Sequence, residues 1–307
     1  MKIINLNDDI PPEALGTCLA IGSFDGIHKG HMQIIEQVKA RARELGKKSA
    51  ILTFEPHPIS FFRPDIKNYR ITDQKMRQQL LADNGVDFMF IADFDEDFSK
   101  ITALDFVKNW LVGKLKVSEV FTGEDFIFGH ERTGNARMLD DLSLKLGFRY
   151  NKIAKITDKN NERFSSTGIR KMILNERVDQ VEPALGRNYR IRGTVIKGAE
   201  MGRKIGFRTA NIDLGEFIIP KFGVYECRAH IDGETYNAIA NIGIKPSIYE
   251  ANKTNRPLLE VHIFNFDRDI YGKEIAVELL RFIREERKFS SVEELKKQIE
   301  KDVETIK

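Results

Sequence analysis

Two kinds of segment alternate through the first half of the chain. Short apolar runs with the length of buried strands lie at residues 17–21, 49–54, 86–91, 117–122 and 149–156. Segments with helical periodicity lie between them, at about residues 29–45, 75–82, 102–112 and 136–146. Strands that alternate with helices at this pitch predict a parallel sheet covered by helices on both faces.

The pattern changes after about Glu182. Strand-like runs now follow one another without intervening helices, at residues 190–195, 223–231, 235–242, 259–266 and 274–282. Asp232 and Gly233 form a hairpin signal between two of them. Ser291, followed three residues later by Glu294, is a capping box that begins a last helix reaching about residue 306. Short antiparallel strands with one terminal helix predict a small barrel.

These patterns divide the chain into two expected domains. Residues 1–182 are expected to form an α/β domain with a doubly wound parallel sheet. Residues 183–307 form a small antiparallel β-barrel domain with a C-terminal helix. The length of 307 residues is comfortable for two domains, and 41% hydrophobic residues allow each to bury its own core.

Composition narrows the classes of partner. The formal net charge is only +3 and basic residues form no continuous run, so we expect no nucleic-acid partner. The chain has no stretch of eighteen apolar residues, so we expect no membrane span. Cys18 and Cys227 lie far apart in apolar runs and are expected to be buried free thiols, which fits a reducing cytoplasm.

The turn after the first apolar run has the composition of a phosphate site. Residues 22–31 read GSFDGIHKGH and lead into a predicted helix. Glycines let the backbone approach a ligand closely, and a helix N-terminus offers free N–H groups to phosphate. His28 and His31 are three residues apart, so both should project from one face of the first helical turn. Two imidazoles there can stabilise charge on a phosphate during in-line attack.

Other interpretations of this turn are weaker. A His-x-x-His pair can bind a metal ion, but no third ligand stands at the required spacing nearby. The glycine spacing does not match the dinucleotide-binding fingerprint. Several glycines and two histidines within ten residues therefore favour a binding site over simple packing.

Three later loops carry further candidates. Residues 53–58 read TFEPHP, residues 123–129 read GEDFIFG, and residues 165–170 read SSTGIR. His57 is either a polar contact or an ordinary surface residue. Phe126 and Phe128 could flank a flat ring, although aromatic loop residues pack against a core at least as often. Hydroxyls and Arg170 at a helix start can hold phosphate, and a simple N-cap explains the hydroxyls equally well.

The second half has its own set of candidates. Residues 193–198 read GTVIKG and residues 202–211 read GRKIGFRTAN, without any P-loop pattern. Thr209 and Asn211 share one face of an extended segment and offer the hard oxygen ligands that Mg²⁺ prefers. Glu260 interrupts an apolar strand and could take the proton of an attacking alcohol. An exposed strand glutamate is the ordinary alternative.

Together these motifs resemble the bacterial bifunctional riboflavin kinase/FAD synthetases. The resemblance of the first half rests on the four loops just described. The resemblance of the second half rests on the GRKIGFRTAN run and on five shorter motifs that come after it in the sequence. These shorter motifs are Gly223–Tyr225, Asn241–Gly243 with Pro246, Leu259 to His262, Tyr271–Lys273 and Ile283–Phe289. The motifs occur in the family's order and cover nearly the whole chain.

The resemblance implies that the sheet of residues 1–182 is of the nucleotidyltransferase type, and it implies roles for individual residues. The C-terminal domain would phosphorylate riboflavin to FMN with Glu260 as the base, and the N-terminal domain would adenylylate FMN to FAD with His28 and His31 at the phosphates. Expected contacts to ATP or its phosphates are Gly22, Phe24, Asp25, Gly26, His28, His31, Ser166, Thr167, Arg170, Gly198, Gly202, Thr209 and Asn211. Expected flavin contacts are His57, Asp125, Phe126, Phe128 and Arg284.

The resemblance also implies the small molecules involved. ATP is the co-substrate, riboflavin, FMN and FAD are the other ligands, Mg²⁺ is bound by Thr209 and Asn211, and no prosthetic group is expected. One departure is Arg208, which stands where the family usually has proline, a residue that fixes φ. Two alternatives remain: only the FMN adenylyltransferase is active, or the chain is a flavin- or nucleotide-binding regulator with inactive sites.

Overall fold

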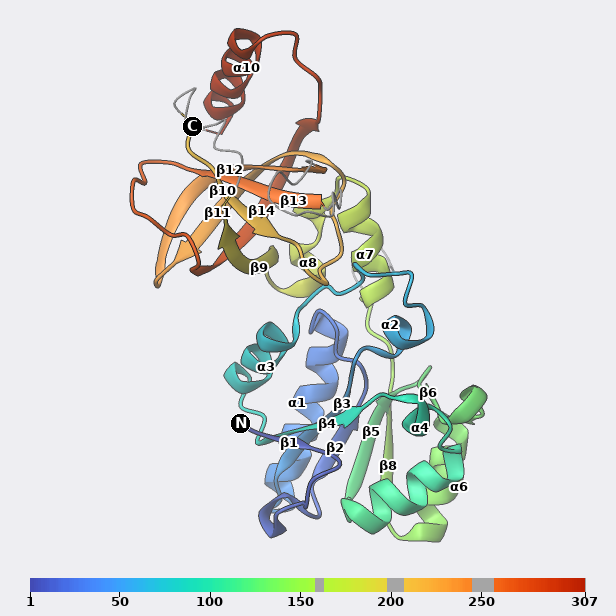
Figure 1. Ribbon diagram of the computed structural model, residues 1–307. Helices are drawn as coiled ribbons and strands as arrows, with labels where there is room; N and C mark the ends of the chain where they lie inside the picture. The colour runs from blue at the N-terminus through green and yellow to red at the C-terminus, as the bar shows by residue number, and fades with distance from the viewer. Residues whose placement is uncertain (158–162, 198–206, 245–256, 307) are drawn as a thin grey trace. The chain divides into compact units, whose positions relative to one another are not determined.

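The computed structural model describes residues 1–157, 163–197, 207–244 and 257–306, drawn in Figure 1. The chain folds into two compact units. The first contains Met1–Lys67 and Gln74–Ser165. The second contains Asn68–Asp73 and Ser166–Lys307, so a short segment from the first half of the sequence belongs to the second unit.

A six-stranded parallel sheet in the order β1-β4-β3-β2-β5-β8 forms the centre of the first unit. The strands are β1 (Lys2–Asn5), β2 (Cys18–Ile21), β3 (Ser49–Glu55), β4 (Phe88–Asp93), β5 (Glu119–Gly123) and β8 (Arg149–Ile153). The chain moves outward from β2 through β3 to β4 on one side, and from β5 to β8 on the other. The strand order therefore reverses between β2 and β5, where sheets of this kind bind their ligands.

Helices cover both faces of this sheet. They are α1 (Lys29–Glu44), α2 (Pro58–Phe62), α3 (Gln74–Asp83), α4 (Glu96–Ser99), α5 (Ala103–Asp105), the π-helix η2 (Phe106–Lys114) and α6 (Ala136–Leu146). Alternate residues of β2 belong to different cores, because Cys18 packs with Ile35 of α1 and Leu19 packs with Leu111 of η2. A two-stranded sheet of β6 (Ile127–Phe128) and β7 (Gly134–Asn135) follows β5.

The second unit is built on a closed antiparallel barrel in the order β10-β13-β12-β11-β14-β9. Its strands are β9 (Tyr189–Ile196), β10 (Ala210–Asp213), β11 (Gly223–Ile231), β12 (Glu234–Ile244), β13 (Pro257–Ile263) and β14 (Glu274–Glu285). The helices of this unit are α7 (Ser166–Leu174), α8 (Glu182–Leu185) and α10 (Val292–Glu304). The predicted fold class, a parallel sheet followed by a barrel with a C-terminal helix, is confirmed.

The segment Asn68–Asp73, which we call the strap, is held by ion pairs within the second unit. Arg70 is 2% exposed and pairs with Glu216 at 2.8 Å. Asp73 accepts hydrogen bonds from the guanidinium of Arg192 at 2.8 and 2.9 Å. The strap thus contributes two ion pairs, one of them made by a buried arginine, to the unit that contains the barrel.

Several details differ from the sequence-based expectations. The helix expected from Thr102 begins there, with the Thr102 hydroxyl accepting from the Asp105 N–H, but continues as a π-helix whose wider turns bury Phe106 and Leu111. The strand expected at residues 149–156 ends at Ile153. The strands β1 and β10 were not predicted, because each has only four residues and little apolar pattern.

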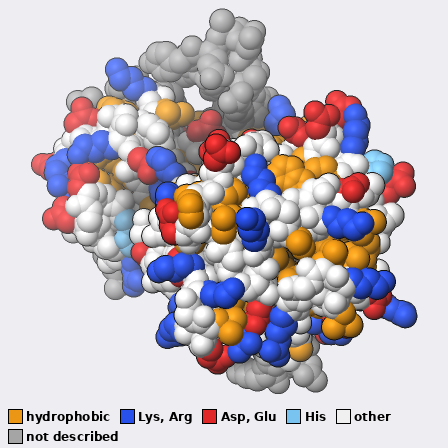
Figure 2. Space-filling view, turned by 90° about the horizontal axis from the view of Figure 1, so that it is seen from below, with side chains coloured by type: hydrophobic (Ala, Val, Ile, Leu, Met, Phe, Trp, Pro, Cys, Tyr) orange, Lys and Arg blue, Asp and Glu red, His pale blue; other side chains and the backbone are white. Residues whose placement is uncertain are grey.

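The surface carries both signs of charge. On the face shown in Figure 2, acidic and basic side chains are interspersed with apolar ones. This agrees with the mild net charge of +3. Within the described part of the chain, no helix combines the length and the apolar character that crossing a bilayer requires.

Candidate active sites

The turn between β2 and α1 has an unusual backbone. Phe24 has a φ of 48° and Ile27 a φ of 42°, and Gly26 between them has a φ of 89°. Left-handed backbone is uncommon for residues with a side chain and is concentrated at functional sites. The turn also follows β2, next to the point where the strand order reverses.

The structure brings His28 and His31 together at the start of α1. Their rings stack with centroids 3.8 Å apart. His28 is the N-cap of the helix and only 6% exposed, and its Nδ1 accepts a hydrogen bond from the His31 N–H at 3.3 Å. Because Nδ1 accepts, the proton of neutral His28 lies on Nε2, which remains a donor. An imidazole donor beside a helix N-terminus suits a phosphate oxygen.

Gly30 is required by this packing. A Cβ atom at Gly30 would lie 3.0 Å from the His28 ring and 3.1 Å from the carbonyl oxygen of Phe164. Both approaches are tighter than ordinary van der Waals contact, and one of them is to backbone. The absence of a side chain at this position therefore lets the His28 ring lie against the first turn of the helix.

The loops after β3 and β5 place the other candidates of the first unit. His57 is 6% exposed, and its Nδ1 accepts from the Ile59 N–H at 3.1 Å to cap α2. Phe128 belongs to the buried core, and Phe126 stacks on it with centroids 5.4 Å apart. The roles of these three residues toward flavin stay predictions.

Asp125 is held by an arginine. Arg163 pairs with its carboxylate at 2.8 Å. Partial burial raises the pKa of the Asp125 carboxyl, but the hydrogen bond and the positive charge of Arg163 outweigh this and lower the pKa below its ordinary value. Asp125 is therefore a carboxylate at neutral pH and can accept hydrogen bonds.

Ser166, Thr167 and Arg170 open α7, which belongs to the second unit. Arg170 is 8% exposed, its Nε donates to the carbonyl oxygen of Tyr69 at 2.9 Å, and its guanidinium lies 3.7 Å from the centre of the Tyr69 ring. Arg170 thus contacts the strap. The expectation that these three residues close over the nucleotide of the first unit stays a prediction.

The barrel places Asn211 directly opposite Glu260. The two residues pair in the antiparallel register of β10 and β13, and Asn241 of β12 pairs with Glu260 from the other side. Directly opposite residues point to the same face of a sheet, with Cβ atoms about 4.5–5.5 Å apart. The amide of Asn211, the carboxylate of Glu260 and the amide of Asn241 therefore form one row across the barrel.

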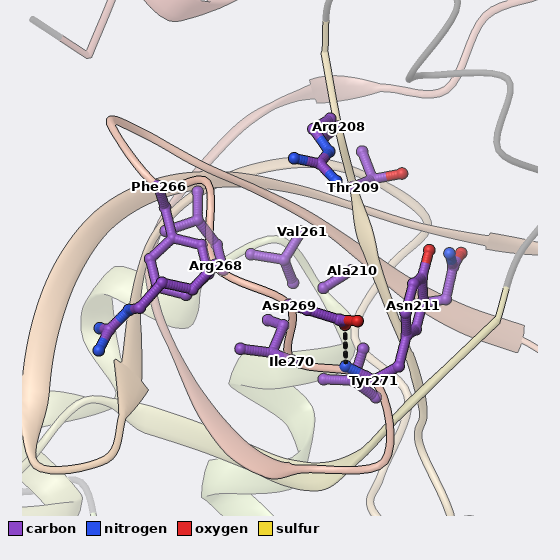
Figure 3. Close-up of a pocket in the computed structure, with 12 residues that line it drawn as sticks. Arg208, Thr209, Ala210, Asn211, Val261, Phe266, Arg268, Asp269, Ile270 and Tyr271 are labelled. Carbon is purple, nitrogen blue, oxygen red and sulfur yellow. Dashed lines mark hydrogen bonds between the residues drawn. The ribbon is translucent and has the colours of Figure 1, made fainter.

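A pocket begins at one end of this row. Figure 3 shows Thr209 and Asn211 at one side of it and Phe266 with Arg268 across from them. The lining residues are Val195, Arg208, Thr209, Ala210, Asn211, Val261, Ile263, Phe266, Arg268, Asp269, Ile270 and Tyr271. The lining combines apolar side chains with hydroxyl, amide and charged groups, so it offers both surface for a ring and partners for polar atoms of a small molecule. Asn211 thus belongs both to the pocket lining and to the row that contains Glu260.

Arg208 also lines the pocket, in place of the proline that the family usually has. Its carbonyl oxygen accepts a hydrogen bond from Nδ1 of His262 at 2.8 Å. This bond fixes the backbone next to Thr209 without a proline ring. His262 itself is held edge-on against the Phe207 ring, with centroids 5.2 Å apart.

The remaining candidates of the second unit lie at the barrel's last strand or outside the described residues. Arg284 of β14 donates to both carboxylate oxygens of Asp302 in α10, at 2.7 to 3.0 Å. Its role toward flavin stays a prediction. Gly198 and Gly202 lie outside the described residues.

Two groups of contacts were not predicted from the sequence. Tyr271, Phe266 and Arg268 line the barrel pocket, although only Tyr271 belonged to a recognised motif. Arg77 of α3 is 1% exposed and donates to the turn after β2. The sequence did contain a signal for this buried arginine: Arg77 lies four residues before Leu81, on the apolar side of a short helix. A charged residue on such a side needs buried partners.

Comparison with known proteins identifies the family. A family model described as FAD synthetase matches residues 10–168, and one described as riboflavin kinase matches residues 185–307. The chain belongs to the bifunctional riboflavin kinase/FMN adenylyltransferases. The two matched regions include every described candidate residue of both sites except Arg170, which lies two residues beyond the first match.

Relatives match over nearly their full lengths. The protein named bifunctional riboflavin kinase/FMN adenylyltransferase from Haemophilus influenzae is 39% identical and covers 95% of this chain and 94% of its own length. The protein of that name from Bacillus subtilis is 36% identical and covers 98% of this chain and 96% of its own.

One solved structure is similar along the whole chain. It is that of a protein named as a macrolide-efflux protein from Streptococcus pneumoniae, and it has a TM-score of 0.85 with 28% sequence identity. It covers 100% of this chain and 99% of its own. The name of that protein differs from the names of the two sequence relatives, which both refer to flavin synthesis.

Proposed function

We propose that this family member makes FAD from riboflavin in two ATP-dependent steps, one in each unit. The barrel phosphorylates riboflavin to FMN, and the N-terminal unit adenylylates FMN. The proposal is carried by the register that pairs Asn211, which lines the barrel pocket, with Glu260 on the neighbouring strand. We also propose a cytoplasmic location, because both cysteines are buried free thiols.

In the kinase step, Glu260 accepts the proton of the primary hydroxyl group of the ribityl chain. The hydroxyl oxygen forms a bond to the γ-phosphorus of ATP, and the bond from that phosphorus to the β–γ bridging oxygen breaks, which releases ADP. The pocket beside Thr209 would hold the nucleotide. Asn211 lines that pocket and pairs in register with Glu260, so the proposed base is the cross-strand neighbour of a residue that would contact the nucleotide.

The barrel site suits Mg²⁺. The hydroxyl of Thr209 and the amide oxygen of Asn211 are hard oxygen ligands, and phosphate and water oxygens would complete an octahedron. When bound, the ion would neutralise charge on the phosphates. The two side chains also orient the phosphates by themselves, because both can donate or accept hydrogen bonds at the pocket edge.

In the adenylyl transfer, an oxygen of the FMN phosphate forms a bond to the α-phosphorus of ATP. The bond between that phosphorus and the α–β bridging oxygen breaks, and pyrophosphate leaves. Nε2 of His28 donates a hydrogen bond to phosphate oxygens, and His31 beside it adds a second polar ring. No covalent intermediate with the chain is needed, because positioning and charge stabilisation suffice for this reaction.

Two variants separate the steps. We expect Glu260→Gln to lower FMN formation from riboflavin by about 10²–10⁴-fold, since it removes a general base, while FAD formation from supplied FMN is unchanged. With riboflavin as the substrate, the His28→Ala variant should form FMN but convert little of it to FAD. Chromatography of flavins after incubation with riboflavin, ATP and Mg²⁺ measures both. If the wild-type chain forms neither FMN nor FAD, the regulator alternative is correct instead.

A further inference from the structure

We propose that Arg77 is a positioning residue for adenylyl transfer, which holds the backbone of the turn after β2 in its phosphate-binding shape. This inference rests on the proposed function of that turn. Arg77 does not belong to any of the motifs in the loops, and it reaches the turn from α3. Arg77, the turn and its other partners all belong to the first unit.

A single buried guanidinium connects two of the candidate loops. Nη1 of Arg77 donates to the carbonyl oxygen of Ser23 at 3.0 Å. Nη2 donates to the carboxylate of Glu55, the last residue of β3, at 2.8 Å. The hydroxyl of Thr53 donates to the same Ser23 carbonyl at 3.2 Å. Arg77 is 1% exposed, so water does not compete for these bonds.

The Ser23 carbonyl is a sensitive point of the turn. It belongs to the peptide that precedes Phe24, the first residue of the turn with left-handed backbone. In a trans peptide the N–H points away from the C=O, so donors on the Ser23 oxygen fix the direction of the Phe24 N–H. A strained backbone persists only where its surroundings hold it in place. Arg77 and Thr53 supply that restraint.

The consequence for catalysis is positional. The same turn continues into His28, whose ring caps α1. If the Ser23 peptide rotates, the residues between it and His28 change their path, and the imidazole moves relative to the phosphates. Misplacement of a catalytic group by about 1 Å can cost on the order of 10²-fold in rate. Arg77 therefore acts on turnover through the turn, without contacting the substrate.

A purely structural role is the competing explanation, and Arg41 provides the matched control. Arg41 lies in α1 of the same unit and donates to the buried carboxylate of Glu119 at 2.7 Å. It also pairs with Glu44, near the end of α1 opposite to His28. Replacing either arginine with lysine weakens a buried ion pair, but only one of them contacts the turn.

The experiment compares Arg77→Lys with Arg41→Lys in the full chain. For Arg77→Lys we expect kcat for FAD formation from FMN to fall about 10- to 100-fold, with KM for ATP changed less than threefold. FMN formation from riboflavin by the same molecules should be unchanged. Arg41→Lys should keep both rates within threefold, even if its melting temperature is lower.

The outcomes are decisive in both directions. An Arg77→Lys protein that melts earlier but keeps the wild-type kcat would overturn the inference. If Arg77→Lys does not fold, Thr53→Val replaces it in the test, since it removes one donor to the Ser23 carbonyl and nearly conserves the shape of the side chain. A kcat for FAD formation at least threefold below the wild-type value supports the inference, and an unchanged kcat overturns it. A wild-type chain that makes no FAD contradicts the proposed function instead, which distinguishes the two failures.

Discussion

Single residues in this chain often serve folding and chemistry at once. His28 is the N-cap of α1 through Nδ1, and the same residue is a proposed phosphate ligand. Asn211 is a barrel residue paired with Glu260, and it also lines the pocket. Substitutions at such residues change stability and turnover together. Each test therefore needs a control variant that changes stability without changing turnover.

His230 of β11 makes the barrel sensitive to pH. Burial and the positive charge of Arg190 lower the pKa of its imidazole below the ordinary value of about 6.5, although Glu278 opposes the shift through a 3.3 Å contact. Arg228 lowers it further, and Thr235 lies 3.0 Å from Nδ1. The folded barrel therefore prefers neutral His230.

The sign of the effect follows from linkage. A depressed folded-state pKa contributes stability that is present above the unfolded pKa and is lost as the pH falls toward the folded value. We expect the urea midpoint of the barrel to decrease between pH 7.5 and 5.5, and His230→Gln to decrease less over the same range. Equal pH dependence of the two proteins would show that His230 does not carry the effect.

At the scale of elements, strand register determines the geometry of the proposed kinase site. Asn211 faces Glu260 only in the observed pairing of β10 with β13, and a slip by one residue would turn one of the two side chains to the other face. His262 also ties β13 to the backbone of Arg208, just before β10. The geometry of the site therefore depends on closure of the barrel.

The C-terminal helix α10 is attached to the barrel through one buried carboxylate. Asp302 is 4% exposed and accepts from Arg284, and also from Gln298 at 2.8 Å. We expect Asp302→Ala to lower the free energy of unfolding by about 3 kcal/mol, because the guanidinium of Arg284 loses its carboxylate partner and, among the described residues, keeps a hydrogen bond only to the carbonyl oxygen of Glu285. Urea denaturation followed by circular dichroism measures the change.

The control for this prediction is Arg287→Ala. Arg287 pairs with Glu294 at 2.6 Å, and both side chains are exposed. Exposed pairs contribute about 0–1 kcal/mol, so this variant should be nearly as stable as the wild type. If Asp302→Ala is no less stable than Arg287→Ala, the attachment of α10 does not depend on the carboxylate.

The sequence predicted the elements with a strong hydrophobic pattern. The expected bounds of β11 and α6 agree with the structure, because their apolar residues alternate or repeat at the helical period. β10 was missed, since ANID is short and half polar and is a strand only by pairing with two neighbours. Arg77 was missed because its partners are a backbone carbonyl and a distant carboxylate.

At the scale of the whole chain, the two units are not consecutive in sequence. The chain enters the second unit at Asn68, returns to the first at Gln74 and enters the second again at Ser166. A boundary near residue 182 separates the expected activities, and it stays a prediction. A fragment that begins at residue 187 would lack both the strap and α7, although it contains every strand of the barrel.

The strap predicts a stability difference between the fragment and the full chain. We expect a fragment of residues 166–307 to melt several degrees below the barrel of the full chain, because Glu216 and Arg192 lose Arg70 and Asp73. Asp73→Ala in the full chain should lower the melting temperature of the barrel in the same direction by a smaller amount. Identical melting of fragment and full-length barrel would contradict a stabilising role for the strap.

The position of the strap also sets an order of events during synthesis. Residues 68–73 leave the ribosome long before their partners Arg192 and residues 216–218 have been translated. The first unit can complete its sheet after β8, whereas this segment can pack only when those later partners are present. Translation therefore finishes the two halves of this enzyme at different times, and the strap is the part of the early half that is packed last.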